Sequence, residues 1–80
     1  MYLSVKEVKA TSNFLLHLTF ENGEKRLFDM NLFLDNGIFR ELRDISKFNS
    51  VKVSFDTIEW DNEADLDPEV LYQYSEKIEE

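Results

Sequence analysis

The dipeptide Asn22-Gly23, which stands between two apolar-rich runs, constrains this chain more than any other feature. Asn-Gly between strand-like residues is the strongest short-range signal for a tight β-hairpin, because both residues tolerate the positive φ angles that such turns need. In the run before it, every second residue is large and apolar, as in a strand with one buried face. These residues are Phe14, Leu16, Leu18 and Phe20. The sequence therefore predicts a hairpin that buries this face.

The residues beside the turn allow two hairpin registers. A two-residue turn places Leu18 opposite Leu27, but it also brings Glu21 opposite Glu24. Like charges directly opposite each other on neighbouring strands are destabilising. A three-residue loop with the glycine in a bulge relieves this repulsion and pairs Leu18 with Arg26. The sequence predicts the hairpin and leaves its register open.

The segment before the hairpin predicts a further strand. Residues 2–10 alternate between apolar and polar side chains, and the alternation breaks between Val5 and Val8. A break of this kind predicts a β-bulge, because one extra residue shifts the side chains that follow to the other face. Residues 11–13 are expected to form the turn into the hairpin.

Short helical segments are predicted after the hairpin. Asp29 and Asp44 each precede a few residues of helical character, and an Asp side chain at that position accepts hydrogen bonds from unpaired amides. Gly37 is expected to end the first turn, residues 30–34. The apolar residues that follow have helical spacing and predict a buried helix face. They are Ile38, Phe39, Leu42 and Ile45.

A second hairpin and a last helix complete the expected elements. Apolar and polar residues alternate over 51–55 and again over 58–60, with a turn expected at Asp56-Thr57. Residues 61–66 are expected to form a loop. Asp67-Pro68 is a clear helix start, because proline suits the first helical position. In this helix one face would hold Leu71, Tyr74 and Ile78.

These elements predict an α+β fold: a small antiparallel sheet in the order β-β-β, short helices, β-β and a C-terminal helix. Eighty residues suit one domain, residues 1–80. The chain has no cysteine, which excludes disulfides and thiolate sites. It shows neither a signal peptide nor an apolar run long enough to cross a bilayer. We therefore expect a soluble, cytoplasmic protein without a membrane role.

The net charge of −8 comes entirely from the last part of the chain. Residues 1–56 hold eight basic and eight acidic side chains and are neutral. Residues 57–80 hold nine acidic side chains and one lysine, which gives −8. Because an acidic surface repels phosphate groups, direct binding of nucleic acid is not expected.

No group of residues carries a catalytic or cofactor signature, so the expectation is a non-enzymatic protein without a cofactor. His17, the single histidine, lies in mid-strand and is interpreted as a half-buried sheet residue rather than a general base or ligand. Alternate residues from Asp61 to Asp67 are acidic, like the first ligands of a calcium loop, but Leu66 and Tyr72 replace the required Gly and Glu. A weak divalent-cation or small-ligand site is therefore the alternative hypothesis; otherwise these acids simply favour a helix N-terminus.

Two aromatic residues border these acids and indicate a partner surface. Exposed Trp and Tyr are typical anchors of protein interfaces, although Trp60 and Tyr72 could instead pin the last helix to the sheet. The main hypothesis is a protein-interaction or regulatory module that binds a basic protein partner through residues 59–69. The candidate partner-binding residues are Trp60, Asp61, Glu63, Asp65 and Tyr72. A homodimer through an exposed edge strand, residues 3–10, is a further expectation.

Several blocks of the sequence resemble a family of small bacterial proteins, the domain of unknown function 2442. The first blocks are Leu18-Thr19-Phe20-Glu21-Asn22-Gly23-Glu24, Phe28-Asp29, and Gly37-Ile38-Phe39-Arg40-Glu41-Leu42-Arg43-Asp44 with Phe48. The most specific block is Ile58-Glu59-Trp60 followed by Ala64-Asp65-Leu66-Asp67-Pro68-Glu69-Val70-Leu71-Tyr72. Between them this chain reads Asp61-Asn62-Glu63, where family members tend to read Pro-Asn-Gly. The departure argues against a tight turn after Trp60.

The resemblance covers nearly the whole chain. It implies a small α+β fold and supplies no activity or catalytic residue. Some relatives continue into a helix-turn-helix DNA-binding domain, which is not expected within this chain. Single-domain relatives often stand beside other small uncharacterised proteins in a toxin–antitoxin-like arrangement, which implies binding of a partner.

Overall fold

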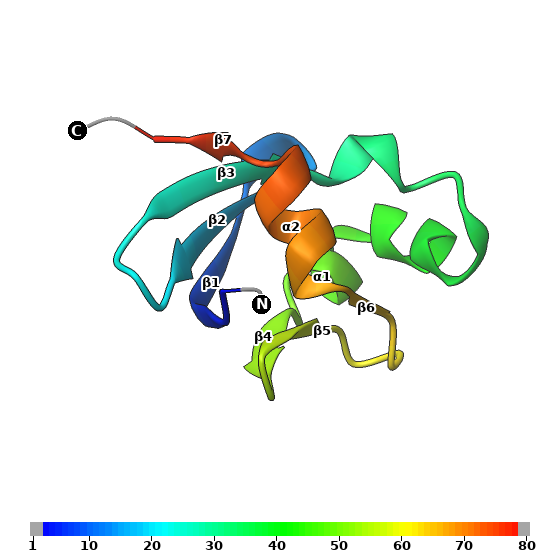
Figure 1. Ribbon diagram of the computed structural model, residues 1–80. Helices are drawn as coiled ribbons and strands as arrows, with labels where there is room; N and C mark the ends of the chain where they lie inside the picture. Colours follow the sequence, from blue (N-terminus) through cyan, green and yellow to red (C-terminus); the bar gives the residue numbers. More distant parts are fainter. Residues whose placement is uncertain (1–2, 79–80) are drawn as a thin grey trace.

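The computed structural model describes residues 3–78, which form two antiparallel sheets and several short helices (Figure 1). The strands are β1 (Val5–Thr11), β2 (Leu15–Phe20), β3 (Lys25–Asp29), β4 (Lys52–Ser54), β5 (Thr57–Glu59), β6 (Asp65–Leu66) and β7 (Glu76–Lys77). The helices are η1 (Ser12–Phe14), η2 (Met30–Leu32), η3 (Gly37–Arg43), α1 (Ile45–Phe48) and α2 (Pro68–Tyr74), where η denotes a 3-10 helix. One sheet has the order β1-β2-β3-β7 and the other β4-β5-β6. The predicted α+β class is confirmed, with two sheets in place of one.

The hairpin of β2 and β3 forms with the three-residue loop. Leu16 pairs with Phe28 and Leu18 pairs with Arg26, which selects the register that keeps Glu21 away from Glu24. This register buries alternate residues of β2, as predicted. The alternative two-residue turn is wrong for this chain.

Strand β1 pairs with β2 and carries the predicted bulge. Val5 is opposite Phe20 and Glu7 is opposite Thr19, so one extra residue of β1 lies between them. The turn into β2 lies later than expected, because Phe14 adopts a positive φ of 61° and belongs to η1 rather than to the strand. The Phe14 ring packs edge-on against Phe48 with centroids 5.2 Å apart, which anchors the turn to the core.

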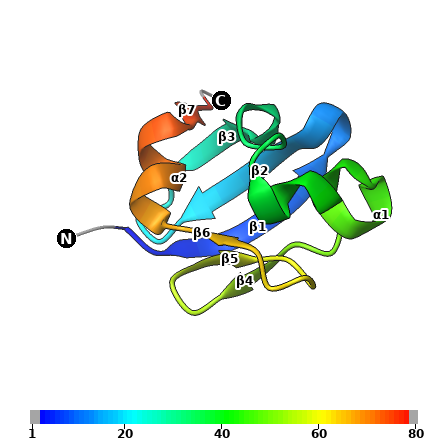
Figure 2. The same cartoon turned by 90° about the vertical axis from the view of Figure 1, so that its right-hand side faces the viewer.

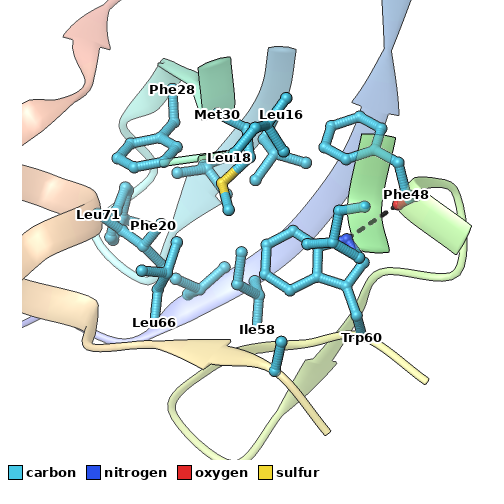
Figure 3. Packing of buried hydrophobic residues seen from close by; sticks show 14 residues of the cluster. Leu16, Leu18, Phe20, Phe28, Met30, Phe48, Ile58, Trp60, Leu66 and Leu71 are labelled. Carbon is cyan, nitrogen blue, oxygen red and sulfur yellow. Dashed lines mark hydrogen bonds between the residues drawn. The ribbon is translucent and has the colours of Figure 1, made fainter. Parts of the chain in front are cut away.

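The core fills the space between the four-stranded sheet, α2 and the second sheet (Figures 2 and 3). Its largest fully buried side chains are Trp60, Phe20, Phe28, Phe48, Leu16, Leu18, Met30, Leu42, Ile58 and Leu71. They come from every region of the chain between β2 and α2. Burial of these groups is the main source of stability for a domain of this size.

The second sheet lies beside the start of β1, where the Val5 amide donates a hydrogen bond of 3.0 Å to the Asp56 carbonyl (Figure 2). Its first hairpin turns one residue earlier than expected, at Phe55 and Asp56, because Ser54 pairs with Thr57. Phe55 has a φ of 57° and is 99% exposed. The strand expected over residues 51–55 is therefore shorter, because β4 covers only Lys52–Ser54 and Phe55 belongs to the turn.

The predicted helix caps are confirmed. The carboxylates of Asp29, Asp44 and Asp67 each accept a hydrogen bond from the amide two residues later, at the starts of η2, α1 and α2. Gly37 was expected to end the first helical turn, but it begins η3 with a φ of 49°. Ile45 is 64% exposed, so it does not share the buried face of Leu42.

The last helix is shorter than its apolar spacing predicts. Helix α2 ends at Tyr74, and the chain then pairs with β3 as β7, with Leu27 opposite Glu76. Arg26 stabilises this change of direction: its Nε donates to Ser75 Oγ at 2.7 Å and its Nη2 to the Ser75 carbonyl at 2.8 Å. The expected helical face through Ile78 is therefore wrong. The sequence also predicts fraying at Glu79-Glu80, because these acidic side chains oppose the helix dipole, and that prediction lies outside the described residues.

Candidate functional site

The acidic segment, residues 59–69, is built around a tight turn that the sequence argued against. The Trp60 amide donates to the Ala64 carbonyl and the Glu63 amide donates to the Trp60 carbonyl, both at 2.9 Å. The Asn62 carboxamide oxygen accepts from the Ala64 amide at 3.0 Å. Glu63 occupies the left-handed position of this turn, with a φ of 70°. The turn forms although a glutamate stands where glycine would be unstrained.

The Trp60 side chain lies in the core beneath this turn and not on the surface of the molecule. Its side chain is 1% exposed, and its Nε1 donates a hydrogen bond of 3.0 Å to the Phe48 carbonyl (Figure 3). The Phe39 and Phe48 rings each lie 6.3 Å from it, centroid to centroid. The expectation that Trp60 is a partner-binding residue is therefore corrected. Trp60 holds the helical segment around Phe48 against the end of β5. It does not hold α2 against the sheet, as the alternative interpretation proposed.

The carboxylates of the turn project into solvent. Asp61, Glu63 and Asp65 are all exposed, whereas Ala64 and Leu66, on either side of Asp65, are buried. This alternation directs the three acidic side chains outward and the two apolar side chains into the core. Within residues 3–78, none of the three acids forms an ion pair. The turn thus presents three unneutralised negative charges on a fixed backbone.

Asn62 fixes the turn against the neighbouring helical segment. Its side-chain nitrogen, Nδ2, donates hydrogen bonds of 3.4 Å to the Ile38 carbonyl and to a carboxylate oxygen of Glu41. Asp61 donates its backbone amide to Ser50 Oγ at 3.2 Å. A surface pocket of about 210 Å³ lies at this junction. It is lined by Glu41, Leu42, Lys47, Ser50, Asp61 and Asn62.

Tyr72 contacts the first hairpin instead of the acidic turn. Its ring packs edge-on against Phe20 with centroids 5.2 Å apart, and the Arg26 guanidinium lies 4.3 Å from its centroid. Its hydroxyl donates to Glu24 at 3.1 Å. This hydrogen bond is the first cause of the raised pKa of Tyr72, and desolvation adds to it. Tyr72 therefore pins α2 to the hairpin, as the alternative interpretation held, and the structure does not bring it together with Asp61, Glu63 and Asp65.

The structure also places the remaining sequence candidates, which are His17 and the possible metal ligands among the acidic residues. His17 is half-buried in β2 between Lys9 and Leu27. Among residues 3–78, no three His, Asp or Glu side chains lie close enough to hold a metal ion. None of the helices in that range is long and apolar enough to span a membrane.

The structure also exposes a surface that the sequence reasoning missed. The outer face of the four-stranded sheet holds Leu15 and Leu27, half-buried, and beside them Leu32 and Tyr74 are 65% and 56% exposed. The signal was present in the sequence, because Leu15 and Leu27 are the apolar residues at outward positions of alternating strands. The tertiary structure adds Leu32 and Tyr74, which come from distant parts of the chain.

Comparison with known proteins identifies the family. The family model described as "Protein of unknown function (DUF2442)" matches residues 5–77, nearly the whole chain. The chain belongs to this family. Neither a curated protein nor a solved structure matches it. Membership of DUF2442 assigns no activity, so the function has to be argued from the surface of the domain.

Proposed function

We propose that this DUF2442 domain is a non-enzymatic protein-interaction module that binds a basic protein partner through the acidic segment. The observation that carries the proposal is the turn at Asp61, Glu63 and Asp65, which fixes three exposed, unneutralised carboxylates on a buried support. Like charges held close together repel each other, and a basic partner relieves that repulsion. Trp60 contributes by holding the turn rather than by contact.

The rigidity of the turn favours binding over a solvated loop. The backbone and Asn62 hydrogen bonds fix the positions of the acidic side chains before a partner arrives, so little conformational entropy is lost on binding. A module of this kind fits a regulatory role in a toxin–antitoxin-like pair, where one small protein recognises another. Charge complementarity of this kind acts mainly on the association rate and weakens as salt is added.

The experiment is capture of partners from native lysate by the wild-type domain and two variants with equal changes in charge, read by mass spectrometry. The test variant carries Asp61→Asn, Glu63→Gln and Asp65→Asn. The control carries Glu7→Gln, Glu21→Gln and Asp35→Asn, which neutralise three exposed acids outside the segment. We expect one stoichiometric partner that the wild type and the control retain and the test variant loses. Retention by the test variant, or no partner at low salt, overturns the proposal.

The competing hypothesis of a divalent-cation site is tested with the same protein. Trp60 lies directly before the acidic turn, so its fluorescence reports changes there. We expect no change in emission on titration with calcium, magnesium or manganese, because no three carboxylates among residues 3–78 lie close enough to hold a metal ion. A saturable change at millimolar metal that the variant Asp61→Asn, Glu63→Gln, Asp65→Asn abolishes would favour the cation site.

A further inference from the structure

One face of the four-stranded sheet has no covering layer. The inner face packs on the core, and the helices and the second sheet all lie on that side (Figures 1 and 2). Within residues 3–78, no helix or strand covers the outer face. An antiparallel sheet tolerates such a face when its outward residues are polar. Here they are only partly polar, because Leu15 and Leu27 lie at its centre.

A pocket of about 300 Å³ opens beside these leucines. It is lined by Leu15, Leu27, Asp29, Leu32, Tyr74 and Glu76. Its apolar groups suit the aliphatic part of a long side chain, and its two carboxylates suit a positive charge at the end of that side chain. The pocket therefore has the chemistry to hold a lysine or an arginine.

Four residues that pair across the strands form a row on the same face, and the end of this row farthest from the pocket holds a lysine, Lys9. Lys9 is opposite His17, His17 is opposite Leu27, and Leu27 is opposite Glu76. Lys9 and Glu76 are both exposed, and neither forms an ion pair within residues 3–78. Neighbouring strands lie about 4.8 Å apart, which separates the ends of the row by roughly 14 Å. The two charges are too far apart to pair within one molecule.

We propose that this outer face binds a second copy of the chain about a two-fold axis that runs parallel to the strands. Such an axis exchanges β1 with β7 and β2 with β3. It brings Lys9 of each copy to Glu76 of the other, with the lysine stem over Leu27 and Tyr74, and it covers the exposed apolar groups. Packing of two sheets face to face with their strands roughly aligned is a common arrangement.

The remaining geometry favours a second copy over an edge-to-edge pair or an unrelated partner. The beginning of the β1 edge is occupied, because the Val5 amide is bonded to Asp56, and the opposite edge strand β7 is only two residues long. The row is complementary to its own rotated copy, which an unrelated partner does not require. The turn after β5 lies on the other side of the molecule from the sheet (Figures 1 and 2), so the acidic segments of two copies stay apart.

The experiment measures the oligomeric state by sedimentation equilibrium for the wild type, Lys9→Glu, Glu76→Lys and the double variant with both changes. We expect a wild-type dimer, a dissociation constant raised about tenfold or more by either single change, and recovery of wild-type affinity in the double variant. Within one molecule the two sites lie too far apart to explain that recovery. Lys52→Glu, the same charge change on exposed β4, is the control and should leave the dimer intact.

Two results would overturn the dimer: a wild type that is monomeric at millimolar concentration, or a double variant that is no more dimeric than the single variants. Circular dichroism and urea unfolding of each variant separate a lost interface from a lost fold. The inference does not rest on the proposed function, because it uses a different surface. The variant Asp61→Asn, Glu63→Gln, Asp65→Asn should dimerise like the wild type, whether or not it loses its partner.

Discussion

The domain contains two turns with almost the same hydrogen bonds and very different sequences. In the first, the Phe20 amide donates to the Glu24 carbonyl and the Gly23 amide donates to the Phe20 carbonyl, both at 2.9 Å. The Asn22 carboxamide oxygen also accepts a hydrogen bond of 3.0 Å from the Glu24 amide, two residues later. The turn from Trp60 to Ala64 repeats each of these bonds. The left-handed position is held by glycine in the first turn and by Glu63 in the second.

The difference teaches where each turn obtains its stability. Gly23 accepts a φ of 88° without strain, so the local sequence suffices for the first turn. Glu63 bears a steric cost in the same conformation, and the second turn forms because buried contacts of Trp60 on one side of it outweigh that cost. Local residues specify the first turn, and tertiary packing imposes the second.

The largest effect is expected when this packing is removed. Trp60→Ala should lower the free energy of unfolding by about 3–5 kcal/mol, because it leaves a cavity and removes the hydrogen bond from the indole to the Phe48 carbonyl. Urea denaturation followed by far-ultraviolet circular dichroism measures it. Trp60→Phe keeps much of the apolar contact and loses the hydrogen bond, and it should cost less. A loss below 1 kcal/mol for Trp60→Ala would mean that the turn does not depend on its buried support.

Exchanging the left-handed residues should have smaller effects of opposite sign. Gly23→Glu should destabilise the domain by about 1–2 kcal/mol, since no atom lies within 4 Å of the added Cβ and the cost is conformational. Glu63→Gly should stabilise it by up to about 1 kcal/mol. Glu63→Gln is the control, because it removes the charge and keeps the strained conformation. Equal gains from Glu63→Gly and Glu63→Gln in the same urea titration would assign the cost to charge instead of backbone.

The smallest effect is the pH dependence that Glu24 gives to the first turn. Desolvation alone would raise the pKa of Glu24, but hydrogen bonds from Tyr72, Asn22 and Arg26 and the charge of Arg26 outweigh it, and the pKa is lowered. A carboxyl group with a lowered folded-state pKa stabilises the fold above its unfolded pKa, and that contribution disappears as pH falls through the folded pKa.

We therefore expect Glu24→Gln to flatten the loss of stability below pH 4.5, the ordinary value for this group, and Tyr72→Phe to flatten it in part. Thermal unfolding at a series of pH values checks this expectation. Identical pH slopes for the wild type and Glu24→Gln would contradict the proposed network around Glu24.

Local signals predicted much of the fold and only part of the candidate site. The Asn22-Gly23 hairpin, the bulge after Val5 and the caps at Asp29 and Asp67 each depend on a few neighbouring residues, and all of them are present. The sequence does not predict the end of α2, because that end depends on hydrogen bonds from Arg26, which lies on the distant strand β3, to Ser75. Of the candidate site residues, Asp61, Glu63 and Asp65 are exposed, whereas Trp60 is buried and Tyr72 contacts the first hairpin.

What the sequence determined by itself is therefore the set of elements whose conformation is fixed within a few residues: the turn at Asn22-Gly23, the alternating polarity of β2 and the capped helix starts. Only the tertiary structure decided that Trp60 is a buried support, that Tyr72 belongs to the first hairpin and that Glu63 adopts a left-handed turn. The physical reason is that burial of apolar surface depends on residues far apart in the chain. Once an aromatic ring is buried, its contacts outweigh local conformational preferences of about 1–2 kcal/mol.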